Sequence, residues 1–263
     1  MNAAIHHRQK RNAGFTLMEI LIVSAILVTL AMLAYSGGRR MITSSRIVAS
    51  SANLRSLAIA NTTYLADNGV YCPAADKTNN RRWHGARKSS GGRFDATQGF
   101  LSPYLGKSAQ ATMCPLFRAL VSGFEEGTGG YGYNAAYIGG LPGGPFDRTG
   151  ILIPQRPANV ANPGKTVMFT TSAYAQSAGL QESATCEPPF WDYGAGPSGN
   201  KPSPTVHFRA HDKALVAWCD GSVTAESKNS STPGNNPHGG DAKKWNLGWF
   251  GPVENNGFWN PAN

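Results

Sequence analysis

The sequence predicts an α+β fold in which one long N-terminal helix packs on an antiparallel sheet with a loop-rich extension. Three observations lead to this class. No proline or glycine interrupts residues 39–68, prolines divide the chain after Gly69 into short segments, and an Asp-Gly pair separates two strand-like runs near residue 220. With 31 glycines and 17 prolines in 263 residues, the part after the helix is expected to be rich in loops.

Charge is low in amount and uneven in placement. Only 15% of residues are charged, and 24 Lys and Arg against 15 Asp and Glu give a net charge of +9. These values exclude a coiled coil, a highly charged disordered chain and a multi-pass membrane protein. Before Asp67 the chain has a single acid, Glu19, among seven Lys and Arg residues. This basic arm favours anionic partners or a membrane surface.

Residues 15–35 form an apolar run of membrane length. As a helix they would extend roughly 31 Å at ~1.5 Å per residue, close to the hydrocarbon thickness of about 30 Å. The run exceeds the usual ~7–15 residues of a signal-peptide core, although Ala34-Tyr35-Ser36 is a weak cleavage site. Glu19 lies inside the run, and an acid in such a position is usually functional and partnered.

A resemblance follows from the residues at the start of this run. The segment resembles the prepilin cleavage and methylation motif of type IV pilins and type II secretion pseudopilins through Gly14-Phe15-Thr16-Leu17-Met18-Glu19, preceded by Arg8, Lys10 and Arg11. The resemblance implies that a membrane peptidase cuts between Gly14 and Phe15 and N-methylates Phe15. Cleavage would remove three basic residues and lower the net charge from +9 to +6.

The resemblance also implies a location and partners. The chain would cross the bacterial inner membrane once, with a cytoplasmic N-terminus and a periplasmic body, before an assembly platform adds it to a filament of pilin-like subunits. There, Glu19 of one subunit would pair with the Phe15 amine of its neighbour, since unpaired charges are costly in lipid. The expected function is therefore that of a structural filament subunit, not an enzyme.

The expected organisation has four parts: a leader at 1–14, a transmembrane half-helix at 15–35, an amphipathic half-helix at 36–68 and a globular pilin-like body at 69–263. Gly37-Gly38 offers a hinge between the two halves. Within the body, residues 166–170 are expected to form a strand. Runs at 214–219 and 222–226 flank Asp220-Gly221, which predicts a β-hairpin with Asp220 as a turn residue.

A second resemblance covers the body. It is similar to prepilin-like proteins of planctomycete- and lentisphaera-type bacteria. The residues that carry this similarity are Met113-Cys114-Pro115, Tyr131-Gly132-Tyr133-Asn134, Thr166 to Thr170, and Phe208-Arg209-Ala210-His211 followed by Asp220-Gly221-Ser222-Val223. This resemblance indicates kinship and implies no chemistry, so the role of His211 and Asp220-Gly221 stays open.

Four cysteines lie beyond the apolar run, in what should be an oxidising compartment. They are Cys72, Cys114, Cys186 and Cys219, and none has zinc-ligand spacing. An even count predicts two disulfides, for which we favour Cys72–Cys114 and Cys186–Cys219 because each closes a moderate loop. Buried free thiols are the alternative.

Two groups of residues suggest ligand binding, and each has a structural alternative. Basic residues alternate with aromatic ones in a segment that contains Arg81, Arg82, Trp83, Arg87, Lys88 and Arg93. This pattern suits single-stranded DNA or another polyanion, although a solvated loop is the preferred interpretation. The tail residues Trp245, Trp249, Phe250, Phe258 and Trp259 could stack on glycans, but we expect them to cover the sheet. The alternative function is thus a membrane-anchored binding module for polyanions or glycans.

The remaining patterns do not amount to a catalytic or cofactor site. Residues 127–132 match G-x-G-x-x-G but have no strand before them, so we expect a mobile glycine loop without a dinucleotide. No G-x-S-x-G nucleophile motif accompanies the cluster of His207, His211 and Asp212, so this cluster does not predict a catalytic triad. Asn and Asp residues within 229–241 are a candidate for Ca²⁺, but they lack EF-hand spacing. No cofactor is therefore expected.

Overall fold

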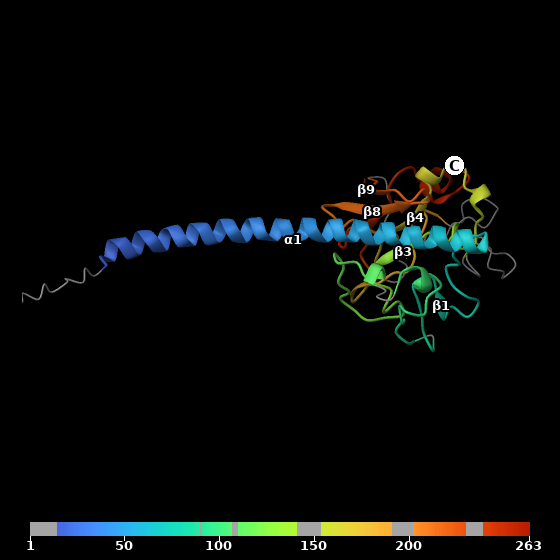
Figure 1. The fold of residues 1–263 in the computed structure, drawn as a ribbon, viewed down its shortest axis with the longest axis horizontal. Helices are drawn as coiled ribbons and strands as arrows, with labels where there is room; N and C mark the ends of the chain where they lie inside the picture. Colours follow the sequence, from blue (N-terminus) through green and yellow to red (C-terminus); the bar gives the residue numbers. More distant parts are fainter. Residues whose placement is uncertain (1–14, 90, 107–109, 141–153, 191–201, 230–238) are drawn as a thin grey trace, which may run out of the picture. The chain divides into compact units, whose positions relative to one another are not determined.

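The computed structural model describes residues 15–89, 91–106, 110–140, 154–190, 202–229 and 239–263. It has the predicted α+β class, with one long helix followed by short antiparallel strands and 3-10 turns (Figure 1). In chain order the elements are α1 (Leu17–Asn68), β1 (Arg81–Arg82), β2 (Gly85–Ala86), η1 (Ser102–Tyr104), η2 (Gln110–Thr112), β3 (Tyr131–Tyr133), η3 (Pro157–Asn159), η4 (Pro163–Lys165), β4 (Val167–Thr171), β5 (Tyr174–Gln176), β6 (Gly179–Gln181), β7 (Val206–His207), β8 (Lys213–Trp218), β9 (Val223–Ser227), β10 (Leu247–Gly248) and η5 (Glu254–Trp259).

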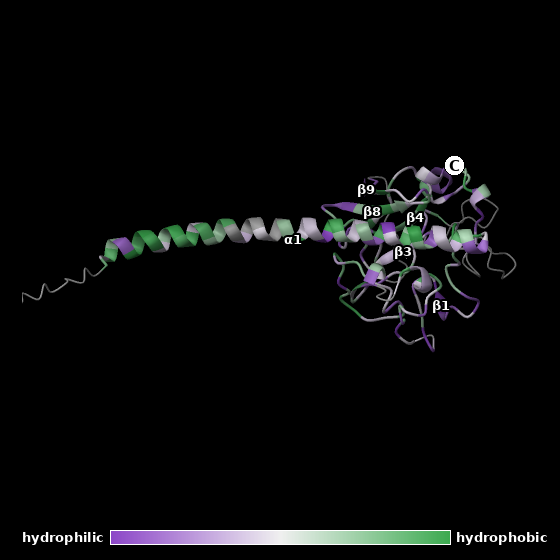
Figure 2. Cartoon of the chain, in the orientation of Figure 1, coloured by the Kyte–Doolittle hydropathy of each residue, from purple (hydrophilic) through white to green (hydrophobic). Residues whose placement is uncertain are grey.

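Helix α1 confirms the predicted helix almost to the residue, and it runs without a break through Gly37-Gly38, where we expected a hinge. The chain divides into two compact units, Met1–Ser45 and Arg46–Asn263, so the second part of α1 belongs to the body. In the first unit, every side chain from residue 15 to residue 33 is exposed, and Figure 2 shows how hydrophobic this stretch is.

A search of the described residues finds no helix with both the length and the apolarity that crossing a membrane requires. The transmembrane assignment of residues 15–35 is therefore not confirmed.

The main sheet is antiparallel, with the strand order β3-β4-β8-β9. Strands β8 and β9 form the predicted hairpin, and Gly221 takes the positive φ of +85° that the tight turn requires. Asp220 accepts hydrogen bonds from the backbone N–H and the hydroxyl of Ser222, at 2.9 and 2.7 Å. Asp220 is thus a turn residue, as expected.

Alternating residues of β8 belong to two different apolar cores of the body. Leu215 and Ala217 join the core that also contains Leu54, Leu57 and Ala58 of α1. Their neighbours in β8 point to the other face and join a second core: Ala214, Val216 and Trp218, together with Trp249, Phe250 and Trp259 of the tail. The helix therefore covers one face of the sheet, and the tail covers the other.

Two tyrosines of β3 connect the sheet to α1 through buried hydrogen bonds. The Tyr131 hydroxyl lies 2.9 Å from Oγ of Ser50. The Tyr133 hydroxyl accepts from Nδ2 of Asn61 at 3.1 Å and donates to the carbonyl of Cys72 at 2.8 Å. All of these side chains are fully buried, so their polar groups depend on one another.

The next residue, Asn134, extends this connection to the tail. Its Nδ2 donates to the carbonyl of Val167 in β4 at 3.0 Å and to the carbonyl of Trp259 at 2.9 Å. Gly132 lets the backbone of Thr185 pack closely against β3, because a Cβ at position 132 would lie 2.5 Å from the carbonyl oxygen of Thr185. The Tyr131-Gly132-Tyr133-Asn134 motif thus connects the helix, the sheet and the tail.

We predict that Tyr133→Phe lowers the free energy of unfolding by about 1–3 kcal/mol, because it leaves the Cys72 carbonyl without its hydroxyl donor in a buried site. Denaturant unfolding followed by circular dichroism would measure the change. The matched control is Tyr104→Phe, since the Tyr104 hydroxyl donates to Asp67 at 3.0 Å in an exposed position. Equal effects of the two substitutions would contradict a special role for Tyr133.

Candidate functional site

The N-terminus of α1 is closed by a reciprocal pair of hydrogen bonds between Thr16 and Glu19. Both the backbone N–H and the hydroxyl of Thr16 donate to Oε2 of Glu19 at 2.8 Å. In return, the backbone N–H of Glu19 donates to Oγ1 of Thr16 at 3.2 Å. This arrangement is a capping box, in which residues three apart satisfy the first donors of a helix. The Thr-x-x-Glu spacing could have indicated it from the sequence.

The capping box places Glu19 in the first turn of α1, four residues after Phe15. The Phe15 side chain is 83% exposed, and the apolar side chains that follow it are exposed as well. Gly14 and the rest of the predicted leader lie outside the described residues. The described part of the motif thus combines a satisfied carboxylate with an apolar helix surface that has no partner within its own unit.

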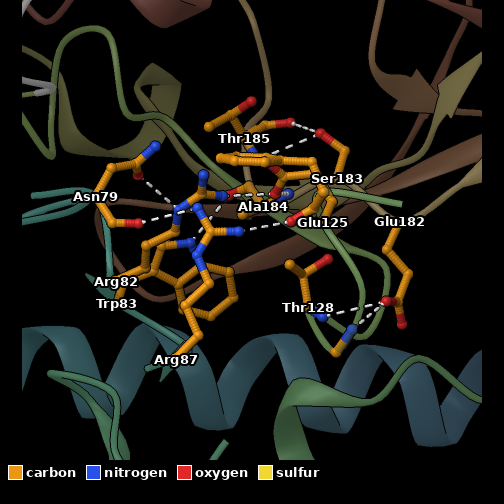
Figure 3. A network of polar contacts seen from close by, with 12 residues as sticks. Asn79, Arg82, Trp83, Arg87, Glu125, Thr128, Glu182, Ser183, Ala184 and Thr185 are labelled. Carbon is orange, nitrogen blue, oxygen red and sulfur yellow. Dashed lines mark hydrogen bonds and ion pairs between the residues drawn. The ribbon is translucent and has the colours of Figure 1, made fainter. Parts of the chain in front are cut away.

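The basic segment does not form the solvated loop that we preferred, because three of its six candidate residues are buried. Arg82 forms an ion pair with Glu125 at 2.5 Å and donates to Oδ1 of Asn79 at 2.8 Å. Arg87 donates to the carbonyl of Phe124 at 2.9 Å and stacks on its ring at 3.9 Å. Figure 3 shows both guanidinium groups in one network beside Glu125.

Trp83 is buried too and donates through Nε1 to the carbonyl of Ala184 at 2.9 Å. Its neighbour His84 is fully buried between the rings of Trp83 and Phe94. Burial, and then the charges of Arg82 and Arg87, lower the pKa of His84 well below its usual value. None of these groups is available to stack on a nucleobase.

Three cations of the segment remain accessible: Arg81, Lys88 and Arg93. They line a groove of about 610 Å³, and Asp95 is the only acid among its described lining residues. The rings of Phe94, Phe100 and Phe124 lie under guanidinium groups of the segment, as Phe100 does under Arg81 at 4.4 Å. What is left of the predicted polyanion site is therefore a basic groove without a stacking surface.

The glycine loop is occupied by a carboxylate of the chain itself. Three successive backbone N–H groups, of Gly127, Thr128 and Gly129, donate to the carboxylate of Glu182 at 2.5, 3.3 and 3.1 Å (Figure 3). Such a run of N–H groups forms an anion-binding nest. Residues 127–130 are also buried, which corrects the expectation of a mobile loop. The G-x-G-x-x-G pattern thus marks a closed structural turn.

The structure contradicts both predicted disulfides, since all four cysteines are free and buried. The backbone N–H of Cys72 bonds to Asn61 at 2.8 Å, whereas Sγ of Cys114 lies 3.5 Å from Oγ of Ser50. Eleven residues of helix separate these two partners by roughly 16 Å, but a disulfide needs a Cα separation below about 7 Å. The length of the loop that a disulfide would close, on which the predicted pairing rests, does not reveal this distance.

Cys186 and Cys219 are kept apart by the sheet. Cys219 belongs to the core on the helix side, and Cys186 belongs to the core on the tail side. Burial raises the pKa of the Cys186 thiol above its usual range and that of the Cys219 thiol to about 12. Both thiols are consequently protonated and unreactive near neutral pH.

The other motif residues have structural positions. His211 is exposed with φ of +51° at a corner before β8. Arg209 donates to the carbonyls of Gly130 and Ser172 and lies 3.2 Å from Nδ1 of His207. Arg209 thereby holds the glycine loop against the strands, which gives this part of the kinship motif an architectural role.

In the tail, Trp249, Phe250 and Trp259 are fully buried, so the tail covers the sheet as preferred. Most of the 229–241 segment considered for Ca²⁺ lies outside the described residues. Where side chains are described, no group of three or more His, Cys, Asp or Glu residues could hold a metal ion.

We predict that the native protein, isolated without reductant, shows four free thiols after denaturation. The geometry leaves each cysteine without a partner within disulfide distance, and burial should make all four react slowly before denaturation. Alkylation followed by mass spectrometry, with and without denaturant, would count them. A bridged peptide under non-reducing conditions would contradict this result.

Comparison with known proteins identifies only the N-terminal region. No curated protein matches the chain, and neither does any solved structure. The family model described as the prokaryotic N-terminal methylation motif matches residues 9–35, which include Gly14, Phe15 and Glu19. With its capping box and exposed apolar helix, the chain therefore carries the prepilin-type cleavage and methylation motif of type IV pilins and pseudopilins.

Proposed function

We propose that the protein is a structural subunit of a type II secretion pseudopilus or a type IV pilus-like filament. The observation that carries this proposal is the methylation motif at residues 9–35, whose part from Leu17 onward lies on a helix with exposed apolar side chains. Exposed apolar side chains on this scale are costly in water, which supports a lipid or helix-bundle environment for them.

The proposed sequence of events starts in the bacterial inner membrane. The prepilin peptidase would cut between Gly14 and Phe15 and methylate the new amine, with the body on the periplasmic side. An inner-membrane assembly platform would then add the subunit to a filament with other pilin-like subunits. The role is structural and requires no catalytic step by this chain.

The capping box suggests how Glu19 could serve both the free and the assembled subunit. In the described structure its carboxylate is satisfied by Thr16 of the same chain. On assembly, the carboxylate would exchange this contact for the Phe15 amine of the neighbouring subunit. Because this amine is cationic, the pair would be stronger in an apolar bundle than a bond between neutral groups.

We predict that Glu19→Ala and Glu19→Gln both abolish filament assembly but leave leader removal intact. The glutamine variant is the decisive one, because its amide oxygen can still accept from Thr16 yet carries no charge. Electron microscopy and shearing assays would detect filaments in cells that express the assembly machinery. Mass spectrometry should find Phe15 at the mature N-terminus of each variant.

Normal filaments from Glu19→Gln would show that helix capping, and not the charge, is what assembly needs. An intact leader on the wild-type chain in cells that contain the peptidase would contradict the filament role itself. Glu19→Asp should give an intermediate result, because it retains the charge but shortens its reach.

The alternative is a membrane-anchored binding module, and the basic groove is the observation that favours it. Its described lining includes the three exposed cations Arg81, Lys88 and Arg93 and one acid, Asp95. Such a groove would attract phosphate or sulfate groups through charge alone and would not read bases.

For this alternative, we predict that replacing Arg81, Lys88 and Arg93 with Gln weakens retention on heparin and makes its salt dependence shallower. The matched control replaces three exposed cations elsewhere, Arg55, Arg156 and Lys165, and so removes the same net charge. Salt elution of the full-length protein in detergent would compare the variants. Equal losses would reject a localised groove in favour of net charge.

A further inference from the structure

One exposed cation of the basic groove, Arg81, is held in a fixed orientation. Its Nε donates to the carbonyl of Gln98 at 3.1 Å, and its guanidinium carbon lies 4.4 Å from the centre of the Phe100 ring. Neither of its two Nη groups has a hydrogen-bond or ion-pair partner among the residues that the structure describes. Arg81 therefore offers the planar fork of a guanidinium in the groove that it lines, and this fork matches the two oxygens of a carboxylate.

The other two exposed cations of the groove supply charge without a fixed orientation. Within the described part of the chain, Lys88 has no hydrogen-bond or ion-pair partner, and Nη1 of Arg93 lies 3.9 Å from the carboxylate of Glu126. Arg87 also lines the groove, but it is buried and uses both Nη groups on backbone carbonyls. Arg81 is thus the cation best placed to recognise the shape of an anion.

The same groove contains hydrogen-bond acceptors, which a site for phosphate alone would not need. Asp95 and Gln98 are both exposed in its lining. The Oδ1 atom of Asp95 accepts from the hydroxyl and the backbone N–H of Thr97 at 2.7 and 2.9 Å, whereas Oδ2 has no partner among the described residues. These hydrogen bonds, from the side chain and then from the backbone of Thr97, lower the pKa of Asp95, so its carboxylate is ionised near neutral pH. A ligand of this groove should therefore carry hydrogen-bond donors beside its anionic groups.

These two requirements distinguish between the classes of polyanion. Single-stranded nucleic acids gain affinity by stacking on aromatic rings, but Phe94, Phe100 and Phe124 already stack with guanidinium groups of the chain. The backbone of a DNA duplex presents phosphate oxygens and has no hydroxyl donor for Asp95. Polysaccharides that contain uronic acids carry a planar carboxylate and free hydroxyl groups on the same sugar ring, and they meet both requirements.

We propose that the basic groove binds an acidic polysaccharide, with a uronate carboxylate on the two Nη groups of Arg81 and hydroxyl groups of the same sugar on Asp95. Lys88 and Arg93 attract the neighbouring carboxylates of the polysaccharide. The inference rests on the alternative function, a binding module that uses this groove, and it names the ligand of that module. It does not involve Glu19, so its failure would leave the filament role untouched.

Fluorescence anisotropy of the full-length protein in a zwitterionic detergent would test this assignment. The probes are an end-labelled oligogalacturonate and a labelled single-stranded oligonucleotide of equal charge, and we expect the oligogalacturonate to bind more tightly at the same salt concentration. Arg81→Lys should weaken oligogalacturonate binding about tenfold, because it keeps the charge but removes the fork. The matched control is Arg93→Lys, which should change the affinity by less than about twofold, because Arg93 supplies only charge.

Asp95→Asn separates the effect of charge from that of hydrogen bonding. Loss of a negative charge would strengthen the binding of every polyanion alike, whereas loss of the ionised acceptor should weaken oligogalacturonate relative to the oligonucleotide. The ratio of the two affinities should therefore fall in this variant.

Equal effects of Arg81→Lys and Arg93→Lys would overturn the assignment, and so would tighter binding of the oligonucleotide by the wild-type protein. If heparin retention still depends on Arg81, Lys88 and Arg93, such a result would reject the uronate ligand and leave the groove as a general anion site. If heparin retention does not depend on them either, the binding module itself would be rejected.

Discussion

The hydrogen bonds between β3 and α1 are the contact on which the rest of the body depends. Tyr131 and Tyr133 reach Ser50 and Asn61, which lie three helical turns apart on the buried side of α1. Apolar contacts alone would allow the helix to slide along the sheet, because they have little directionality. Two buried polar contacts at separate points fix both the position and the rotation of the helix.

A second buried network organises the segment around β1. Arg82 bonds to Glu125 and Asn79, and Arg87 donates to the carbonyls of Phe124 and Asn79 and stacks on the Phe124 ring. Removing one partner of such a buried pair leaves an uncompensated charge, which is far more costly than losing an exposed pair. The network thereby holds in place the short segments that have little regular secondary structure of their own.

The sequence allowed prediction of the features that depend on local pattern. The long helix, the strand near residue 167 and the Asp220-Gly221 hairpin follow from periodicity and turn chemistry, and the structure contains all three. The methylation motif could also be predicted, because its signal lies in adjacent residues.

Features that depend on distant contacts could not be predicted in this way. The burial of Arg82 requires Glu125, which is 43 residues away, and the state of the cysteines depends on which face of the sheet each one occupies. The amino-acid composition gives the number of charged residues and cysteines, but it does not show which of them are in contact in the folded protein.

The carboxylate in the glycine loop has a consequence for how this chain responds to free anions. Glu182 is tethered to the three N–H groups that it occupies, so its effective concentration there is that of an intramolecular ligand, in the millimolar range or above. A nucleotide or phosphate ion whose concentration is below this effective concentration would have to displace the tethered Glu182 carboxylate in order to bind. The glycine loop therefore carries its own intramolecular anion. The same glycine pattern that binds phosphate in other proteins here binds a carboxylate of the chain, which competes with free phosphate for the three N–H groups.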